Sequence, residues 1–258
     1  EHPQQNKLSM AVVHVLLNPC DAMGANILSQ ICEALKPRIE ALTQERVGLC
    51  ILSNLADTKL TQARIIIQNI DTDIGCRIEE ASQFAKVDPY RATTHNKGVL
   101  NGIDPILIAT GNDWRAVEAG IHAYATRQGQ YQPVTEWSMK GNDLHGFFEA
   151  PVIVGTVGGV TQLHPTAKLC LKLLGVQSAN ELSRVIAAVG LTQNLGALRA
   201  LSQEGICQGH MKLHIDNLLL AAGAKAQQMT TARKALEEIL KQQRKVSVKD
   251  AEGVLASI

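Results

Sequence analysis

The chain has 258 residues, of which 45% are hydrophobic, 19% are charged and 3% are aromatic, and its formal net charge is +1. This composition is ordinary for a soluble protein, and the length accommodates one large domain with smaller appendages. A near-neutral charge without a block of lysine and arginine gives no support for binding to nucleic acid or to a membrane surface. No run reaches the ~18 consecutive apolar residues of a membrane-spanning helix.

The cysteines and the N-terminus indicate the compartment. The first six residues are polar and lack the basic-then-apolar order of a signal peptide. Six cysteines lie inside apolar stretches and form no C-x-x-C pair: Cys20, Cys32, Cys50, Cys76, Cys170 and Cys207. We therefore expect reduced core cysteines in a cytoplasmic protein, with a core built from Leu, Ile, Val and Ala because aromatic residues are scarce.

The N-terminal part predicts a β-loop-α-β unit. Residues 8–17 predict a buried strand that contains His14, and residues 46–52 predict a second strand. The intervening helix is predicted from an apolar face at helical spacing: Ile27, Ile31, Leu35, Ile39 and Leu42. Residues 21–26, D-A-M-G-A-N, form the turn before it, where free N–H groups and the helix dipole favour an anion. A small-residue turn alone leaves both a structural turn and a ligand loop open.

A strand over residues 63–70 and a helix over residues 71–86 come next, and Asp88-Pro89 ends that helix. Arg91 follows, and its planar guanidinium suits a substrate carboxylate as well as a surface ion pair.

A short apolar run, residues 106–108, predicts a buried strand, because Pro105 opens it and the turn residues 110–113 close it. Lys97, ahead of this run, would be costly in an apolar neighbourhood unless it were paired, and Asp113 is the nearby opposite charge. We therefore expect the two side chains within hydrogen-bond range, in a pair that is either structural or catalytic.

The central part of the chain mixes helix and strand. Residues 114–126 predict a helix, and residues 135–156 contain two strand-like runs around a turn at residues 140–143. Residues 155–161, G-T-V-G-G-V-T, carry three glycines without the G-x-G-x-x-G spacing, so a Rossmann phosphate loop is excluded. A turn at which backbones approach closely is the plain structural interpretation.

The C-terminal half reads as helical. Residues 165–174 predict a helix ended by Gly175, and residues 178–181 predict a capping box that begins another helix. Residues 230–258 predict two short amphipathic helices, the second capped by Ser247.

His210 and His214 are four residues apart on a predicted helix, a spacing that occurs in metal sites. No glutamate lies between them and no third ligand is evident, so we expect no metal.

Four segments carry a family resemblance. Residues 94–104, T-H-N-K-G-V-L-N-G-I-D, and residues 109–115, A-T-G-N-D-W-R, resemble 3-hydroxy-3-methylglutaryl-coenzyme A reductase of the bacterial class II type. The D-A-M-G-A-N turn resembles the nicotinamide-cofactor motif of that family, and the G-T-V-G-G-V-T segment resembles another, with Val160 in place of a glycine. The resemblance extends from about Leu8 to Ile258.

The resemblance implies an α+β (mixed α/β) fold. It implies the last β-α-β of a ferredoxin-like cofactor domain over residues 1–53 and a large domain for coenzyme A and substrate over residues 54–205. It further implies a helical flap over residues 206–258 that carries the catalytic histidine.

The resemblance also implies a four-electron reduction of the thioester 3-hydroxy-3-methylglutaryl-CoA to mevalonate and coenzyme A, or its reverse. Lys97 is expected to stabilise the carbonyl oxygen, Asp113 to position Lys97, and His210 to protonate the departing thiolate. Three residues are expected at the substrate: Arg91, Asn101 and Asn54. Four are expected at the cofactor, which is NADH or NADPH: Asp21, Met23, Gly24 and Asn26. A homodimer with shared active sites is implied as well.

The chain is expected to be the C-terminal part of a longer enzyme, or a shortened relative. None of its glutamates lies in the E-N-V-I-G-like motif that supplies a catalytic proton in the family, and half of the cofactor domain has no counterpart. Two interpretations follow: a reductase that needs a further N-terminal segment or subunit, or a truncated, non-catalytic paralogue or partner subunit that keeps the fold.

Overall fold

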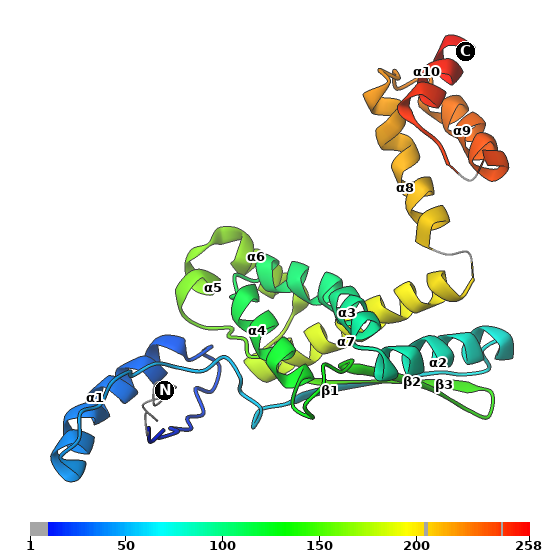
Figure 1. Ribbon diagram of the computed structural model, residues 1–258. Coiled ribbons are helices and arrows are strands. Elements are labelled where there is room, and N and C mark those ends of the chain that lie inside the picture. Colours follow the sequence, from blue (N-terminus) through cyan, green and yellow to red (C-terminus); the bar gives the residue numbers. More distant parts are fainter. Residues whose placement is uncertain (1–9, 204–205, 244) are drawn as a thin grey trace, which may run out of the picture. The chain divides into compact units, whose positions relative to one another are not determined.

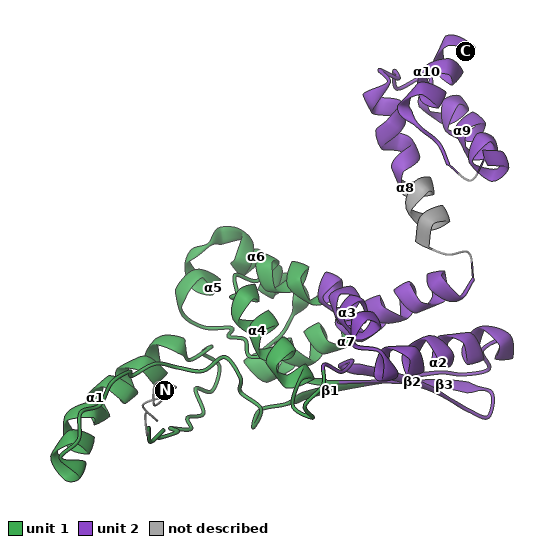
Figure 2. Ribbon diagram, viewed as in Figure 1, with its two compact units in different colours: residues 1–63, 103–130, 149–189 green, residues 64–102, 131–148, 190–258 purple. Residues whose placement is uncertain are grey.

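The computed structural model describes residues 10–203, 206–243 and 245–258, with the backbone alone described for residues 206–213. Most elements of the described chain are helices, and its three strands form one small sheet (Figure 1). The chain divides into two compact units (Figure 2): residues 1–63, 103–130 and 149–189 form unit 1, and residues 64–102, 131–148 and 190–258 form unit 2. Within the described residues, no helix is both long and apolar enough to cross a membrane.

The described strands form a three-stranded sheet with β3 in the middle, in the order β1-β3-β2. The strands are β1 (Thr61–Ile67), β2 (Thr135–Lys140) and β3 (Asp143–Ala150). β2 and β3 are antiparallel, in a register that runs from Thr135 opposite Phe148 to Lys140 opposite Asp143. Every second residue of β3 is buried, as expected for a strand with one face on the core.

Helix α2 (Thr72–Val87) packs on β2 and covers the sheet. Its N-terminus is capped by Asp71, whose side chain accepts a hydrogen bond from Ile74 N at 3.0 Å. Lys86 forms an ion pair with Glu136 of β2. The expected strand over residues 63–70, the helix over 71–86 and the hairpin around 140–143 are therefore confirmed.

Helix α3 (Pro89–Ala109) belongs in part to each unit and overturns one expectation. The run 106–108 was expected to be a strand, but it is the last part of this helix, which also contains Pro105. Asp88 caps the helix through its carboxylate, which accepts from Arg91 N at 3.1 Å. One face of α3 is buried: Ala92, His95, Asn96, Val99, Leu100, Ile103 and Leu107. That spacing is helical, so the burial of one face selects helix over strand.

Unit 1 contains α1 (Ala25–Thr43), α4 (Trp114–Ala125), α5 (Gly159–Leu163) and α6 (Pro165–Leu174). The helix expected between the first two strands is confirmed as α1, and the one expected after Asp113 is confirmed as α4. α6 ends at Gly175, which has a φ of 70° and supplies the left-handed C-terminal residue that was expected.

Helix α7 (Ala179–Ser202) begins with half of the expected capping box. Ser178 Oγ accepts a hydrogen bond from Glu181 N at 3.2 Å. The Glu181 carboxylate, however, accepts from Gln177 N at 2.8 Å, one residue earlier than the box requires.

The three C-terminal helices form a small bundle with its own apolar core (Figure 1). They are α8 (Ile206–Ala221), α9 (Met229–Gln243) and α10 (Val248–Ala256). The core consists of buried residues from all three helices and from the segment before α10: Ile215, Leu219, Ala232, Leu236, Leu240, Val246, Ala251 and Val254. The expected cap at Ser247 is confirmed, since its side chain and that of Asp250 form a complete capping box.

The strands expected near the N-terminus are wrong. The described residues 10–17 and the residues 46–52 contain no strand, and His14 is exposed. A strand needs a hydrogen-bonded partner, and neither segment has one among the described residues. None of the residues of α1, all of which are described, is buried.

The cysteines follow the expectation only in part. Those described are free thiols, but Cys20 and Cys76 are exposed, and Cys32, Cys50 and Cys170 are half-buried, so the expectation of core cysteines is wrong for all five. Cys207 lies outside the described side chains.

Close packing of the sheet predicts that Gly146→Ala is destabilising. A Cβ at position 146 would lie 2.5 Å from Trp137 Cη2 and 2.7 Å from Ile65 Cγ2, so both side chains would have to move. Overpacking of this kind costs typically about 1–3 kcal/mol. Gly196→Ala, within α7 and with nothing within 4 Å of the new Cβ, is the control and should stabilise by roughly 0.5–1 kcal/mol. Urea unfolding measures both, and equal stability of the two variants would contradict the packing.

Candidate functional site

The D-A-M-G-A-N turn (residues 21–26) leads directly into α1. Gly24 is the residue before the helix, with a φ of 95°, and a Cβ there would lie 2.8 Å from Pro19 Cβ. Glycine is therefore required on both conformational and steric grounds. Gly24 offers no side chain to cap the helix, and the first turn of α1 contains no acidic residue. No side chain of a described residue caps these first N–H groups of α1, and the binding of an anion there stays a prediction.

Asp21 ties this turn to two other segments of unit 1. Its carbonyl oxygen accepts hydrogen bonds from Thr156 N at 2.9 Å and from Val157 N at 3.4 Å. Its carboxylate oxygen Oδ1 accepts from Ala179 N, the first residue of α7, at 2.9 Å. The carboxylate thus caps α7, so Asp21 has a structural role beside the cofactor-binding role that was predicted for it.

Asn112 joins the loop after α3 to the G-T-V-G-G-V-T segment. Its side chain is buried, and its Oδ1 accepts from Gly155 N at 2.8 Å while its Nδ2 donates to Thr110 Oγ1 at 3.0 Å. A Cβ on Gly155 would in turn lie 2.6 Å from Met23 N. Three segments that are distant in sequence, residues 21–26, 110–113 and 155–161, therefore meet in unit 1. Sequence analysis missed Asn112, because its partner is a backbone group 43 residues away.

The glycine-rich segment itself is a turn into α5. Gly158 and Gly159 have φ values of 79° and 51°, in the region that favours glycine. Gly111 lies against this turn, since a Cβ there would be 3.0 Å from Val160 Cγ1. The plain structural interpretation, a turn where backbones approach closely, agrees with these contacts.

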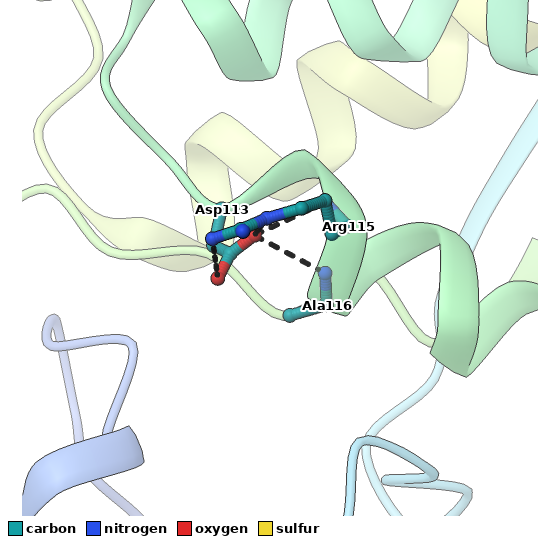
Figure 3. A network of polar contacts seen from close by, with 3 residues as sticks. All are labelled: Asp113, Arg115 and Ala116. Atoms are coloured by element: carbon teal, nitrogen blue, oxygen red, sulfur yellow. Dashed lines mark hydrogen bonds and ion pairs between the residues drawn. The ribbon is translucent and has the colours of Figure 1, made fainter.

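Asp113 is held by its own helix (Figure 3). Its Oδ1 accepts from Arg115 N at 3.1 Å and from Ala116 N at 3.3 Å, which caps α4, and Arg115 Nε lies 3.2 Å from the same oxygen. Burial opposes ionisation, but the hydrogen bonds from Arg115 and Ala116 outweigh it and lower the pKa of Asp113. The residue is therefore an anion, while its pairing with Lys97, which belongs to the other unit, stays a prediction.

Asn54 is exposed, and its backbone packs on α4. Its carbonyl oxygen accepts from Ala56 N at 3.1 Å and would lie 2.7 Å from a Cβ on Gly120. Its role at the substrate stays a prediction.

Lys97 and Asn101 lie on the exposed face of α3, in unit 2. They are four residues apart, so their side chains are neighbours on the helix surface. The expectation that Lys97 lies beside a buried strand and needs a partner to offset burial is wrong, because a lysine on an exposed helical face keeps its hydration. Pro105, inside α3, has no N–H for the carbonyl of Asn101, so that carbonyl is also released from the helix ladder.

Arg91 lies two turns earlier on α3 and is half-buried. Burial lowers the pKa of its guanidinium below the ordinary value, although an arginine remains charged at any physiological pH. His210 is in α8, and its side chain lies outside the described residues, so its proposed role stays a prediction.

A pair of carboxyl groups links α3 to α4 within unit 1. Burial, together with the charge of Glu118 and a side-chain hydrogen bond to it, raises the pKa of Asp104 to about 6. Asp104 Oδ1 is buried and finds no hydrogen-bond partner among the described residues. The neighbouring charge of Glu118 thus favours the protonated form of Asp104, because like charges repel.

We predict that Asn112→Ala destabilises the protein. The substitution leaves Gly155 N buried without an acceptor, which costs about 1–3 kcal/mol. Asn180→Ala, at an exposed position of α7, is the matched control and should stay within about 0.5 kcal/mol of the parent. Thermal or urea unfolding compares the two, and an Asn112→Ala protein as stable as the control would rule out this anchoring role.

We predict that Asp104→Asn changes the dependence of stability on pH. A raised pKa in the folded state means that stability is fully present below the unfolded pKa and is lost as the pH rises through about 6. Asn imitates the protonated acid and removes this loss. The difference in melting temperature between variant and parent should therefore grow between pH 4 and pH 8, in favour of the variant. Parallel profiles at all pH values would show that Asp104 does not hold a proton.

Comparisons with known proteins agree with these motifs. The family model described as hydroxymethylglutaryl-coenzyme A reductase matches residues 3–215. A 3-hydroxy-3-methylglutaryl-coenzyme A reductase from Archaeoglobus fulgidus is 49% identical over 223 residues, which cover 83% of this chain and 50% of that protein. A probable reductase of the same name from Borreliella burgdorferi is 34% identical over 221 residues, or 83% of this chain and 51% of that protein.

Solved structures give the same result. A 3-hydroxy-3-methylglutaryl-coenzyme A reductase from Streptococcus pneumoniae superposes with a TM-score of 0.71 at 43% identity, over 93% of this chain and 58% of that one. A structure of the class II enzyme from the same species, bound to NADPH in open conformations, has a TM-score of 0.70 at 47% identity, over 71% and 53% of the two chains. The chain thus spans about half the length of the curated relatives that it matches. On the strength of the family model and these identities, the chain belongs to the hydroxymethylglutaryl-coenzyme A reductase family.

Proposed function

We propose that the chain provides the lysine-bearing part of an enzyme that reduces 3-hydroxy-3-methylglutaryl-CoA to mevalonate and coenzyme A, or runs the reverse reaction. The observation that carries the proposal is the exposed face of α3, where the family motif T-H-N-K-G-V-L-N-G-I-D presents Lys97 and Asn101 side by side. A cation and an amide that are four residues apart on a rigid helix form a preorganised group for a carbonyl oxygen that gains negative charge.

The residues would act at separate atoms of the thioester. Lys97 donates a hydrogen bond to the carbonyl oxygen and stabilises the charge that develops there, and Asn101 orients that oxygen or the lysine. His210 would protonate the coenzyme A thiolate as it leaves, since an imidazole exchanges protons readily near neutral pH. Arg91 and Asn54 would bind polar groups of the substrate, since a guanidinium pairs with a carboxylate through two parallel hydrogen bonds.

Two molecules of a nicotinamide cofactor, bound in succession, would each supply one hydride for the four-electron reduction. The residues at the start of α1 fit the phosphates of such a cofactor: the turn is fixed by Gly24, the first N–H groups of the helix are uncapped, and no acidic residue of the first turn repels an anion. Asp21 and Met23 hold the turn against residues 155–157 through backbone contacts, and Asn26 stands in the first turn. The Streptococcus pneumoniae structure contains NADPH, so we propose NADPH or NADH for this chain.

We also propose a cytoplasmic homodimer that shares its active sites, joined to the N-terminal part that the relatives carry. The unburied helix α1, the unpaired segment 10–17 and the exposed side chains of Leu42, Leu49 and Ile51 leave apolar surface for such a partner. No observation favours the alternative of a non-catalytic paralogue.

We predict that the 258-residue chain alone oxidises NADPH or NADH slowly in the presence of 3-hydroxy-3-methylglutaryl-CoA. A general acid contributes typically ~10²–10⁴-fold, and no glutamate of the chain lies in the E-N-V-I-G-like motif of the family. Adding the N-terminal half of the Archaeoglobus fulgidus relative should restore the rate, measured by the loss of cofactor absorbance. Lys97→Ala in that mixture should then reduce the rate by about 10²–10³-fold.

Lys140→Ala, at an exposed position at the end of β2, is the matched control and should leave the restored rate unchanged. A chain that is already fast by itself would mean that another carboxyl group is the acid. An unchanged rate with Lys97→Ala would contradict the proposed role of α3.

A further inference from the structure

A buried polar network lies on the side of α3 that faces away from Lys97. His95 Nε2 lies 2.6 Å from Thr135 Oγ1, Thr135 Oγ1 donates to Asn194 Oδ1 at 2.9 Å, and Trp137 Nε1 donates to the same oxygen at 2.8 Å. His95, Thr135, Trp137 and Asn194 are each no more than 2% exposed. The network thus connects α3, β2 and α7 within unit 2.

The direction of every hydrogen bond in this network follows from its chemistry. The indole N–H of Trp137 can only donate, so the atom of Asn194 that faces it is the oxygen. The hydroxyl of Thr135 has a single proton and gives it to that oxygen, so His95 Nε2 must be the donor to Thr135. His95 is therefore the neutral Nε2–H tautomer, and its Nδ1 has no hydrogen-bond partner among the described residues.

His95 does not titrate near neutral pH. Burial, together with the positive charge of Arg91, lowers the pKa of His95 to about 3. The network therefore keeps its hydrogen bonds over the whole physiological range, and its role is geometric rather than acid-base.

Asn96, the residue after His95, adds two hydrogen bonds between α3 and the chain around the start of β2. Asn96 Oδ1 accepts from Val134 N at 3.0 Å, and Asn96 Nδ2 donates to Gln132 O at 2.9 Å. Apolar contacts along α3 permit small rotations, because they have no preferred direction. Hydrogen bonds from two successive residues to the segment 132–135 do have a direction, so they fix both the rotation of the helix and its position along the sheet.

Because α3 is a rigid helix, fixing the rotation of its buried face also fixes the direction of the side chains on its exposed face. Lys97 is two residues after His95, which is about 200° around a helix of 3.6 residues per turn. Lys97, the side chain with the proposed chemical role, thus points away from the network.

We propose that His95, Thr135 and Asn194 are positioning residues for Lys97, and that they fix the rotation of α3 through the hydrogen bond that His95 donates to Thr135. The proposal rests on the proposed function, in which Lys97 stabilises the carbonyl oxygen. A displacement of about 1 Å of a group in contact with the substrate can cost on the order of 10²-fold in rate.

The test compares His95→Phe with His95→Gln. Phenylalanine keeps a buried ring but removes the donor, and it leaves no unsatisfied donor because Thr135 still donates to Asn194. Glutamine has an amide N–H near the position of Nε2 and can restore the bond. In the mixture with the N-terminal half of the relative, His95→Phe should lower kcat about 10- to 100-fold with KM for the thioester unchanged, and His95→Gln should recover most of kcat.

Ser183→Ala is the matched control, because it removes a buried hydroxyl that donates within its own helix, to Asn180 O at 3.0 Å. Its kcat should equal that of the parent. If kcat of His95→Phe equals the parent value, or if His95→Gln is as slow as His95→Phe, the positioning role is overturned.

Amide hydrogen exchange of α3 gives a second measurement that needs no turnover. Exchange at Lys97 and the following turn should accelerate in His95→Phe and return in His95→Gln. Should His95→Phe not fold, Thr135→Val and Thr135→Ser form the equivalent pair, with the serine variant expected to retain slow exchange. Unchanged exchange overturns the positioning role, whereas an inactive parent mixture with the predicted exchange pattern contradicts only the proposed function.

Discussion

The burial of one face of α3 is the constraint on which the rest of the structure depends. Seven residues at helical spacing are buried on one side, and two of them, His95 and Asn96, form directional hydrogen bonds. Once that side is fixed, the position of every side chain on the other side follows from the geometry of the helix. Lys97 and Asn101 can therefore be held rigidly although they themselves are exposed.

The loops of unit 1 are held in a different way, mainly by contacts of backbone groups. Residues 21–26, 110–113 and 155–161 are joined mainly by backbone groups: Asp21 O with Thr156 N, Asn112 Oδ1 with Gly155 N, and the close approach of Gly155 to Met23 N. Loops that are held through the backbone leave their remaining N–H groups in a fixed direction, which suits the binding of phosphates. Helix packing thus places the lysine-bearing surface, and loop packing shapes the turn at which a cofactor is proposed.

Local patterns predicted most helices and the hairpin, because the apolar spacing, caps and turn residues of these elements lie within a few residues of one another. Gly175 after α6 and Ser247 before α10 are examples of caps that the sequence identifies directly. The run 106–108 was misread because a short apolar run between Pro105 and a glycine turn resembles a strand, and periodicity alone cannot separate it from a buried helix. The longer apolar pattern from Ala92 to Leu107 has helical spacing and indicates a helix.

Other features could not be predicted from local patterns. The segments 10–17 and 46–52 have strand-like composition, but strand formation depends on a partner that is absent from the described residues. The network of His95 depends on Thr135 and Asn194, which lie 40 and 99 residues later, and the anchor at Asn112 depends on a backbone N–H. Candidate residues such as Lys97, Asp113 and Asn101 came from family motifs, whereas the residues that hold them in place became visible only in three dimensions.

The measurement that tests the central claim most directly is the chemical reactivity of Lys97 with and without bound substrate. Lysine acetylation, followed by mass spectrometry, compares Lys97 with the exposed Lys140 in the mixture of this chain and the N-terminal half of the relative. If α3 presents Lys97 to the thioester, 3-hydroxy-3-methylglutaryl-CoA protects Lys97 from acetylation and leaves Lys140 unchanged. Equal acetylation of Lys97 in the presence and absence of saturating substrate would contradict the account.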